Sequence, residues 1–168
     1  MSDTELLDVL RKLHLFEGVS EESLQQLATI ARFIDVPAGT TIFRQGETAT
    51  TVYFLVSGRV SLEICAPGIG CKRILTVHEG DLLGWSPVLE NEKLTATART
   101  LLPTRMIAMD GKEIHAECEK YPRLGHEFMR RTALALGKRL NATRLQLLNL
   151  YGDELPESPA STESGETS

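Results

Sequence analysis

The sequence predicts a mainly β domain with helices on both sides of the strand region. Between Phe33 and Met109, short runs rich in β-branched and aromatic residues recur, and turns that contain Gly or Pro separate them. Leucines at helical spacing precede and follow this region. A chain of 168 residues is long enough for one ordinary core, so we expect a single antiparallel sandwich or barrel.

Two helices are expected before the strands. Ser2 and Glu5 form a capping-box pattern for the first helix, and Ser20 opens a second, shorter helix with Glu21 in its first turn. The strands that we expect are Ile34–Val36, Thr40–Phe43, Val52–Val56, Arg59–Ala66, Lys72–His78, Thr95–Thr100 and Thr104–Met109.

A long C-terminal helix is expected over residues 124–151. Along it, apolar residues and one polar residue follow alternating steps of four and three, and Gly152 marks its end. These seam residues are Met129, Ala133, Leu136, Leu140, Thr143, Leu147 and Leu150. A period of about 3.5 residues favours pairing with the same helix of a second chain, and therefore a homodimer. Packing of the helix on the wall of its own barrel is the alternative.

The outer face of the same helix is basic. Its basic residues are Arg130, Arg131, Lys138, Arg139 and Arg144, with no acidic residue between them. We interpret this stripe as solvated charge, which is commoner on a helix than a nucleic-acid contact. Because no helix-turn-helix pattern follows the helix, nucleic-acid binding is not expected.

Residues 1–152 are expected to form the domain, and residues 153–168 an acidic, disordered tail. The tail is rich in Ser, Glu, Pro and Thr, and its five acidic residues account for the whole net charge of −5. No apolar run is long enough to span a bilayer, and the N-terminus has no basic start before an apolar stretch. We therefore expect a cytoplasmic protein without membrane contact.

The three cysteines are expected to be free thiols. An odd count without framework spacing suits a reducing compartment. Cys65 and Cys71 flank the turn at Pro67 and Gly68 and could face each other, but we interpret both as unpaired.

Two segments resemble a known family. Pro37–Glu47 (PAGTTIFRQGE) and Val52–Val60 (VYFLVSGRV) resemble the opening strands of the cyclic nucleotide-binding domain family, with glycines at its turns. The lead-in from Phe16 to Ala31 is similar to the same family, and the long helix resembles the central dimer helix of the catabolite activator type. The resemblance covers roughly residues 10–151. It implies an eight-stranded β-roll, or jelly roll, with a ligand held between a phosphate-binding cassette and the long helix.

The resemblance places the cassette at Gly80–Ala98. In the family, a glycine-rich turn leads into a short helix whose backbone N–H groups face the cyclic phosphate, and here Gly80, Gly84, Trp85 and Ser86 take those positions. Trp85 replaces the carboxylate that binds the ribose hydroxyl, and Leu94 replaces the arginine that pairs with the phosphate. Losing that charge pair forfeits a few kcal/mol, which is roughly two to three decades of affinity.

Other residues bear on the same pocket. Lys93 is near enough to replace the missing arginine, whereas strand alternation points Arg99 to the opposite face. Thr95 keeps a hydroxyl in the cassette. Thr143 lies where the family offers a threonine to the base, or it bonds only its own i−4 carbonyl. Trp85 either fills the vacant ribose space or stacks on a different flat ligand.

The sequence therefore predicts a non-catalytic regulatory or sensor module with a non-standard cassette. We expect it to bind a small anionic ligand other than cAMP or cGMP, or none. The alternatives are a dimeric scaffold protein with a filled pocket, and a transcription regulator of the catabolite activator type without its helix-turn-helix. The candidate ligand-binding residues are Gly84, Trp85, Ser86, Leu94, Thr95 and Thr143. The histidines are scattered and no nucleophile has partners at a suitable spacing, so we expect no metal or catalytic site.

Overall fold

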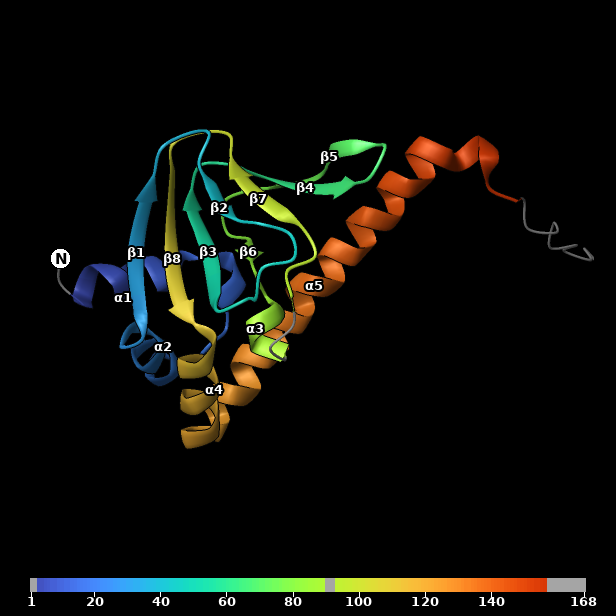
Figure 1. Cartoon of the computed structure of the whole chain (residues 1–168). Helices are drawn as coiled ribbons and strands as arrows, with labels where there is room; N and C mark the ends of the chain where they lie inside the picture. The colour runs from blue at the N-terminus through green and yellow to red at the C-terminus, as the bar shows by residue number, and fades with distance from the viewer. Residues whose placement is uncertain (1–2, 90–92, 157–168) are drawn as a thin grey trace, which may run out of the picture.

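The computed structural model describes residues 3–89 and 93–156. Within them, eight strands form two four-stranded antiparallel sheets, in the orders β1-β8-β3-β6 and β2-β7-β4-β5, with helices at both ends (Figure 1). The predicted fold class is confirmed, because the two sheets make a β-roll of the jelly-roll type that is followed by one long helix.

Helices precede and follow the strand region. The strands are β1 Ala31–Val36, β2 Thr41–Phe43, β3 Thr51–Ser57, β4 Val60–Ala66, β5 Gly70–Val77, β6 Leu82–Leu83, β7 Thr97–Thr100 and β8 Thr104–Asp110. The helices are α1 Asp3–Lys12, η1 His14–Phe16, α2 Glu21–Ala28, α3 Ser86–Leu89, α4 Gly111–Lys120, α5 Pro122–Tyr151 and η2 Gly152–Glu154. Every predicted strand is present within a few residues, and the structure adds β6 and α4.

The N-terminal helices form as the capping pattern predicts. The Ser20 hydroxyl accepts the backbone N–H of Ser23 and so caps α2. Ser2, the predicted cap of α1, lies outside the described residues. The buried face of α1 carries Leu6 and Leu10, which pack into the core.

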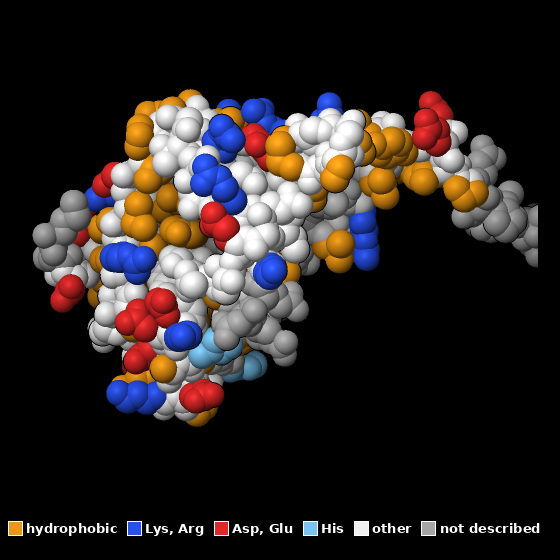
Figure 2. Space-filling model, in the orientation of Figure 1, with side chains coloured by type: hydrophobic (Ala, Val, Ile, Leu, Met, Phe, Trp, Pro, Cys, Tyr) orange, Lys and Arg blue, Asp and Glu red, His pale blue; other side chains and the backbone are white. Residues whose placement is uncertain are grey.

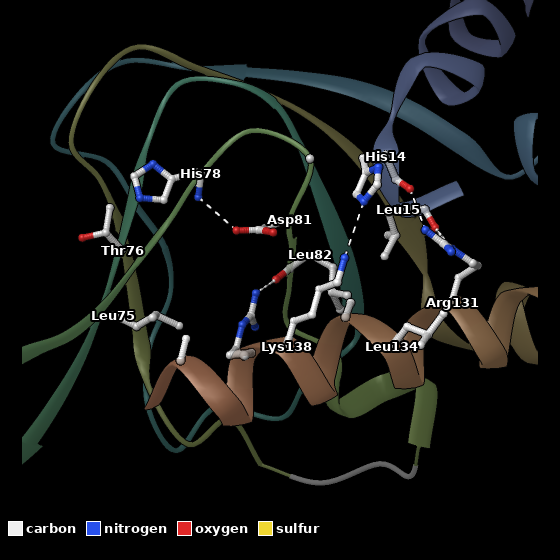
Figure 3. Close-up of a pocket in the computed structure, with 14 residues that line it drawn as sticks. His14, Leu15, Leu75, Thr76, His78, Asp81, Leu82, Arg131, Leu134 and Lys138 are labelled. Atoms are coloured by element: carbon white, nitrogen blue, oxygen red, sulfur yellow. Dashed lines mark hydrogen bonds between the residues drawn. The ribbon is translucent and has the colours of Figure 1, made fainter. Parts of the chain in front are cut away.

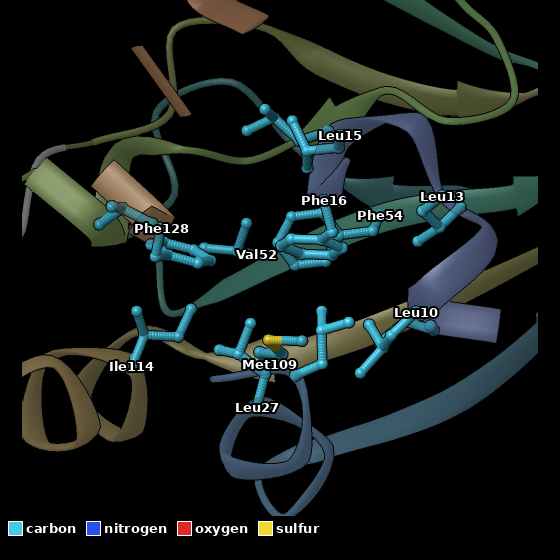
Figure 4. Close-up of a cluster of buried hydrophobic side chains, with 14 of the residues drawn as sticks. Leu10, Leu13, Leu15, Phe16, Leu27, Val52, Phe54, Met109, Ile114 and Phe128 are labelled. Carbon is cyan, nitrogen blue, oxygen red and sulfur yellow. The ribbon is translucent and has the colours of Figure 1, made fainter. Parts of the chain in front are cut away.

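Two apolar clusters stabilise the domain. In the first, the rings of Phe16, Phe54 and Phe128 bring η1, β3 and α5 together (Figure 4). The ring centroids of Phe16 and Phe54 are 5.2 Å apart, and those of Phe54 and Phe128 are 6.4 Å apart. The second cluster lies within the roll and includes Phe43 and Leu94. Because Phe128 belongs to the first cluster, the first turns of α5 are fixed to the barrel.

The β4–β5 hairpin contains a disulfide. Cys65 and Cys71 lie directly opposite each other in its register, with Cα atoms 4.0 Å apart, and their sulfurs are bonded. The prediction of free thiols is therefore wrong for this pair, because the register of the hairpin brings the two side chains together. Cys118 is free, and burial raises the pKa of its thiol, as does the charge of Glu117. The cysteines give no support for a reducing compartment, and a cytoplasmic location stays a prediction.

Helix α5 is 30 residues long, and its second half extends away from the barrel (Figure 1). Its first half packs on α4, η1 and α2. Beyond it, Leu140, Leu147 and Leu150 are 53%, 50% and 66% exposed, and Figure 2 shows hydrophobic side chains along this part of the helix. The C-terminal part of the predicted seam is thus uncovered in the single chain.

The end of α5 agrees with the sequence. The helix stops at Tyr151, and Gly152–Glu154 forms the short helix η2. Residues 157–168 lie outside the described part, so both the disordered tail and the domain limit at residue 152 stay predictions. None of the helices in the described part of the chain is long and apolar enough to cross a membrane.

Candidate ligand-binding site

The cassette backbone runs from β5 through two glycine turns into α3. Gly80 and Gly84 both have positive φ angles, of 86° and 68°. A Cβ on Gly84 would lie 2.9 Å from the backbone carbonyl oxygen of Thr51, so this position needs glycine both for its conformation and for its close approach to β3. The Gly84 turn directs the chain into α3 at Ser86.

A small cavity of about 50 Å³ lies against the cassette. It is lined by Phe43, Leu62, Gly84, Trp85, Ser86, Leu94, Thr95, Ala96 and Arg139. Five of the six predicted ligand-binding residues therefore come together, and Thr143 does not line the cavity. Its volume holds roughly one or two water molecules, so a nucleotide does not enter it as it stands.

The two predicted anchor positions are occupied by hydrocarbon. Leu94 is 9% exposed and packs in the second cluster beside Phe43, so it belongs to the core of the roll. Trp85 is half-buried and packs against the first cluster. Whether Trp85 fills the ribose space or stacks on a different ligand stays a prediction.

The candidate substitutes for the missing arginine lie elsewhere. Lys93 is exposed and is not among the residues that line the cavity. Its backbone forms an isolated antiparallel β-bridge with Thr48. Arg99 is exposed on β7, as strand alternation predicts, with its Nε 3.9 Å from an Oε2 of Glu63. Thr143 is exposed and donates its hydroxyl to the carbonyl of Arg139 at 2.9 Å, the local i−4 bond that was one of its two interpretations.

The basic stripe on α5 is not a solvated face throughout, and that prediction is wrong for two of its members. Arg131 donates to the carbonyl oxygens of Leu15 and His14 at 2.6 and 2.7 Å. Arg139 is half-buried and donates to the carbonyl oxygen of Leu82. The stripe instead fixes α5 to the barrel, because carbonyl groups of η1 and β6 face it.

Arg139 is the functional candidate that sequence reasoning missed. Burial lowers the pKa of its guanidinium, an effect that the nearby charge of Asp81 partly offsets. It lines the cassette cavity and also a second, larger cavity. No local pattern reveals this position, because the acceptor Leu82 lies 57 residues away in the sequence.

The fold and this site match a known family. The family model for the cyclic nucleotide-binding domain matches residues 33–121, just over half of the chain. The chain belongs to the cyclic nucleotide-binding domain family. It is therefore related to regulators and sensors, and the resemblance described above is confirmed.

Curated relatives support the same membership. The chain is 25% identical over 150 residues to a CRP-like cAMP-activated global transcriptional regulator of Mycobacterium tuberculosis, covering 89% of this chain and 65% of that protein. It thus spans just under two thirds of that relative. A putative potassium channel protein of Rhodopseudomonas palustris is 24% identical, over 86% of this chain and 34% of the channel.

Solved structures show the same architecture. A cyclic nucleotide-binding domain from Methylobacillus flagellatus superposes with a TM-score of 0.74 at 19% identity, covering 95% of this chain and 86% of that chain. Identity this low shows the fold alone. A putative cyclic nucleotide-binding protein from Geobacter metallireducens has a TM-score of 0.70 at 26% identity, covering 79% of this chain and 96% of that chain.

The described residues do not bring together a group of three or more His, Cys, Asp or Glu side chains that could hold a metal ion. His115 is placed by a hydrogen-bond contact of 3.1 Å between its Nε2 and the carbonyl oxygen of Pro87. His14 lies on η1, with its Nδ1 2.8 Å from an Oε2 of Glu17. Both of these histidines thus have a local structural contact.

Proposed function

We propose that this chain is a non-catalytic regulatory module that dimerises through α5 and whose cassette does not bind cAMP or cGMP in the family manner. The observation that carries the proposal is the packing of Leu94 into the core of the roll. An arginine at this position would present its charge to the phosphate, whereas Leu94 presents a hydrocarbon side chain. The lost charge pair corresponds to roughly two to three decades of affinity.

The dimer rests on the uncovered apolar face of α5. Leu140, Leu147 and Leu150 are each at least half exposed on a helix that extends beyond its own barrel. A lone helix with such a face gains stability by pairing. The predicted seam also continues toward Met129, which packs against the first cluster, so pairing would link the seam to the barrel.

Two other functions remain distinguishable from this one. A scaffold protein with a filled pocket would share the fold and the dimer but would show no rise in melting temperature with any small molecule. A transcription regulator would need a DNA-binding unit. The relative from Mycobacterium tuberculosis is one by its name, but this chain spans only 65% of it, so that activity is not transferred.

Isothermal titration calorimetry with cAMP and with cGMP tests the cassette. We expect no sub-micromolar binding of either nucleotide to the natural chain. The double variant Leu94→Arg with Trp85→Glu restores both polar anchors and should bind cyclic nucleotides more tightly than its parent. Leu102→Arg adds the same charge at an exposed leucine away from the cavity and is the matched control.

Melting temperatures of all variants accompany these titrations, because Leu94→Arg places a charge among core residues. Sub-micromolar binding of either nucleotide to the natural chain would overturn the proposal. A folded double variant without any gain in affinity would show instead that the cassette backbone itself has diverged.

A further inference from the structure

A second and larger cavity shares Arg139 with the cassette cavity. This α5 cleft has a volume of about 290 Å³ and is enclosed by η1, the end of β5, the β5–β6 turn and α5 (Figure 3). Its lining residues include His14, Asp81, Lys138 and Arg139 among the polar ones. The volume is near the lower end of the range for small-molecule sites.

The electrostatics of the cleft favour an anion. Arg131, Lys138 and Arg139 bring three cations from α5, and Asp81 is the one carboxylate among the lining residues that are described. Arg131 and Arg139 donate to backbone carbonyls, which do not neutralise their charge. Among the described residues Arg139 forms no salt bridge with a carboxylate, and the nearby charge of Asp81 offsets its burial only in part. An anion in the cleft would therefore compensate a charge that is only partly offset now.

Lys138 is held at the rim of the cleft. Its Nζ lies 3.5 Å from Nε2 of His14, while Nδ1 of the same imidazole faces Glu17 at 2.8 Å. Figure 3 shows Lys138 extending from α5 toward His14 across the opening. The ammonium can thus reach a ligand without breaking a carboxylate pair.

The other walls of the cleft are apolar. Leu15 and Leu82 are buried and Leu75 is half-buried, but Leu134 is 43% exposed on α5. At about 100° per residue, Leu134 is turned away from the seam, so a second copy paired along the seam would leave it uncovered. Leu134 therefore offers an apolar surface to a molecule in the cleft.

We propose that the α5 cleft binds a small organic anion with an apolar body, whose acid group pairs with Lys138 and Arg139 and whose body lies against Leu134 and Leu82. The volume of about 290 Å³ suits a small molecule. This site is distinct from the cassette cavity in its lining, because Arg139 is the one described residue that lines both. A ligand here contacts both α5 and the barrel and so stabilises the attachment of the helix.

The test uses 2-naphthoate and its neutral counterpart 2-naphthamide in NMR titrations of the amide-labelled protein. Naphthoate should bind saturably, should shift the amide signals of Gly80, Asp81 and Ala135, and should bind about fivefold to tenfold more tightly than naphthamide, the equivalent of one well-placed ion pair. Lys138→Gln and Arg139→Gln should each remove most of that preference.

Arg130→Gln and Arg144→Gln remove the same charge from exposed positions on the same helix and should leave binding unchanged. Leu134→Glu changes an exposed residue, so it should fold, and its carboxylate should repel naphthoate. The proposal would be overturned by equal affinities for the two compounds, or by the absence of saturable binding at millimolar concentration. It would also be overturned if the signal shifts were confined to Gly84 and Thr95, or if Arg130→Gln reduced the preference for naphthoate as much as Arg139→Gln does. None of these outcomes bears on cyclic nucleotide binding, which the calorimetry tests separately.

Discussion

Replacing Leu140 with glutamate should convert a dimer of this chain into a monomer. Leu140 is 53% exposed in the single chain, so pairing along the seam buries about half of its surface. Full burial of a leucine contributes about 1.5–3 kcal/mol, so the half gained on pairing contributes about 1 kcal/mol in each chain. The dimer therefore loses about 2 kcal/mol of apolar burial from the substitution alone.

The introduced charge adds a larger penalty. A glutamate that stays in the seam must be protonated or buried without a partner, and protonation at pH 7 costs about 3.7 kcal/mol at 1.36 kcal/mol per pKa unit. Even if only one of the two carboxylates had to be neutralised, association would weaken by more than 5 kcal/mol in total, roughly four decades in the dissociation constant. Acidification toward pH 4 should partly restore the dimer, because the penalty disappears as the carboxylates become protonated.

Sedimentation velocity at tens of micromolar measures the outcome. The natural chain should sediment as a dimer and Leu140→Glu as a monomer with a nearly unchanged melting curve for the barrel. Leu102→Glu is the control, because Leu102 is an exposed leucine of similar exposure outside α5. A natural chain that is monomeric under these conditions would refute the reasoning and leave α5 without a partner helix.

Three further predictions follow from the structure. The carboxylate of Glu127 accepts hydrogen bonds from the backbone N–H and the hydroxyl of Ser20, at 3.2 and 3.0 Å. Burial raises the pKa of Glu127, but the hydrogen bonds to its charged form outweigh burial, so the pKa is lowered. Glu127→Gln should lower the free energy of unfolding by about 1 kcal/mol above the ordinary carboxyl pKa, and urea titrations should show this difference vanishing as the pH falls through the lower folded value. Gly84→Ala should lower the melting temperature by several degrees, equivalent to about 1–3 kcal/mol, because its φ is +68° and its Cβ would approach Thr51; an unchanged calorimetric transition would contradict the proposed need for glycine. Removal of residues 153–168 should leave both the melting temperature and the sedimentation behaviour unchanged, and a clear drop in either would show that the tail is docked.

The positions of most strands and of the flanking helices could be predicted because their signals are local. Turn residues such as Gly58 and Gly80 mark where strands stop, and the structure places positive φ angles at both. β6 was not predicted, because its two residues, Leu82 and Leu83, are both buried and show no alternation of buried and exposed side chains. The sequence does contain an N-cap for α4, because the side chain of Asp110 accepts hydrogen bonds from backbone N–H groups of the first turn. The helix was not predicted because it follows β8 directly, without a turn between them.

The disulfide illustrates a prediction that depends on register. The turn between Cys65 and Cys71 could be placed from Pro67 and Gly68, but a shift of one residue in the pairing would have put the two sulfurs on opposite faces. At the base of the hairpin the register is fixed by a buried face, because Val60 and Val77 pair there and are both fully buried. At the turn end the residues of β5 are exposed, so the alternation of apolar residues does not show which residue faces Cys65.

The role of Arg139 could not be inferred from the helix that carries it. Viewed along α5 alone, Arg139 belongs to a basic face, and basic faces on helices are usually solvated. What changes its role is the carbonyl oxygen of Leu82, which β6 brings from a distant part of the chain. The same long-range packing places Leu94 in the core, where the family pattern has a charge. Arg139 lines both the cassette cavity and the α5 cleft, so the cationic side chain next to the cassette comes from the helix and not from the strand that carries Leu94.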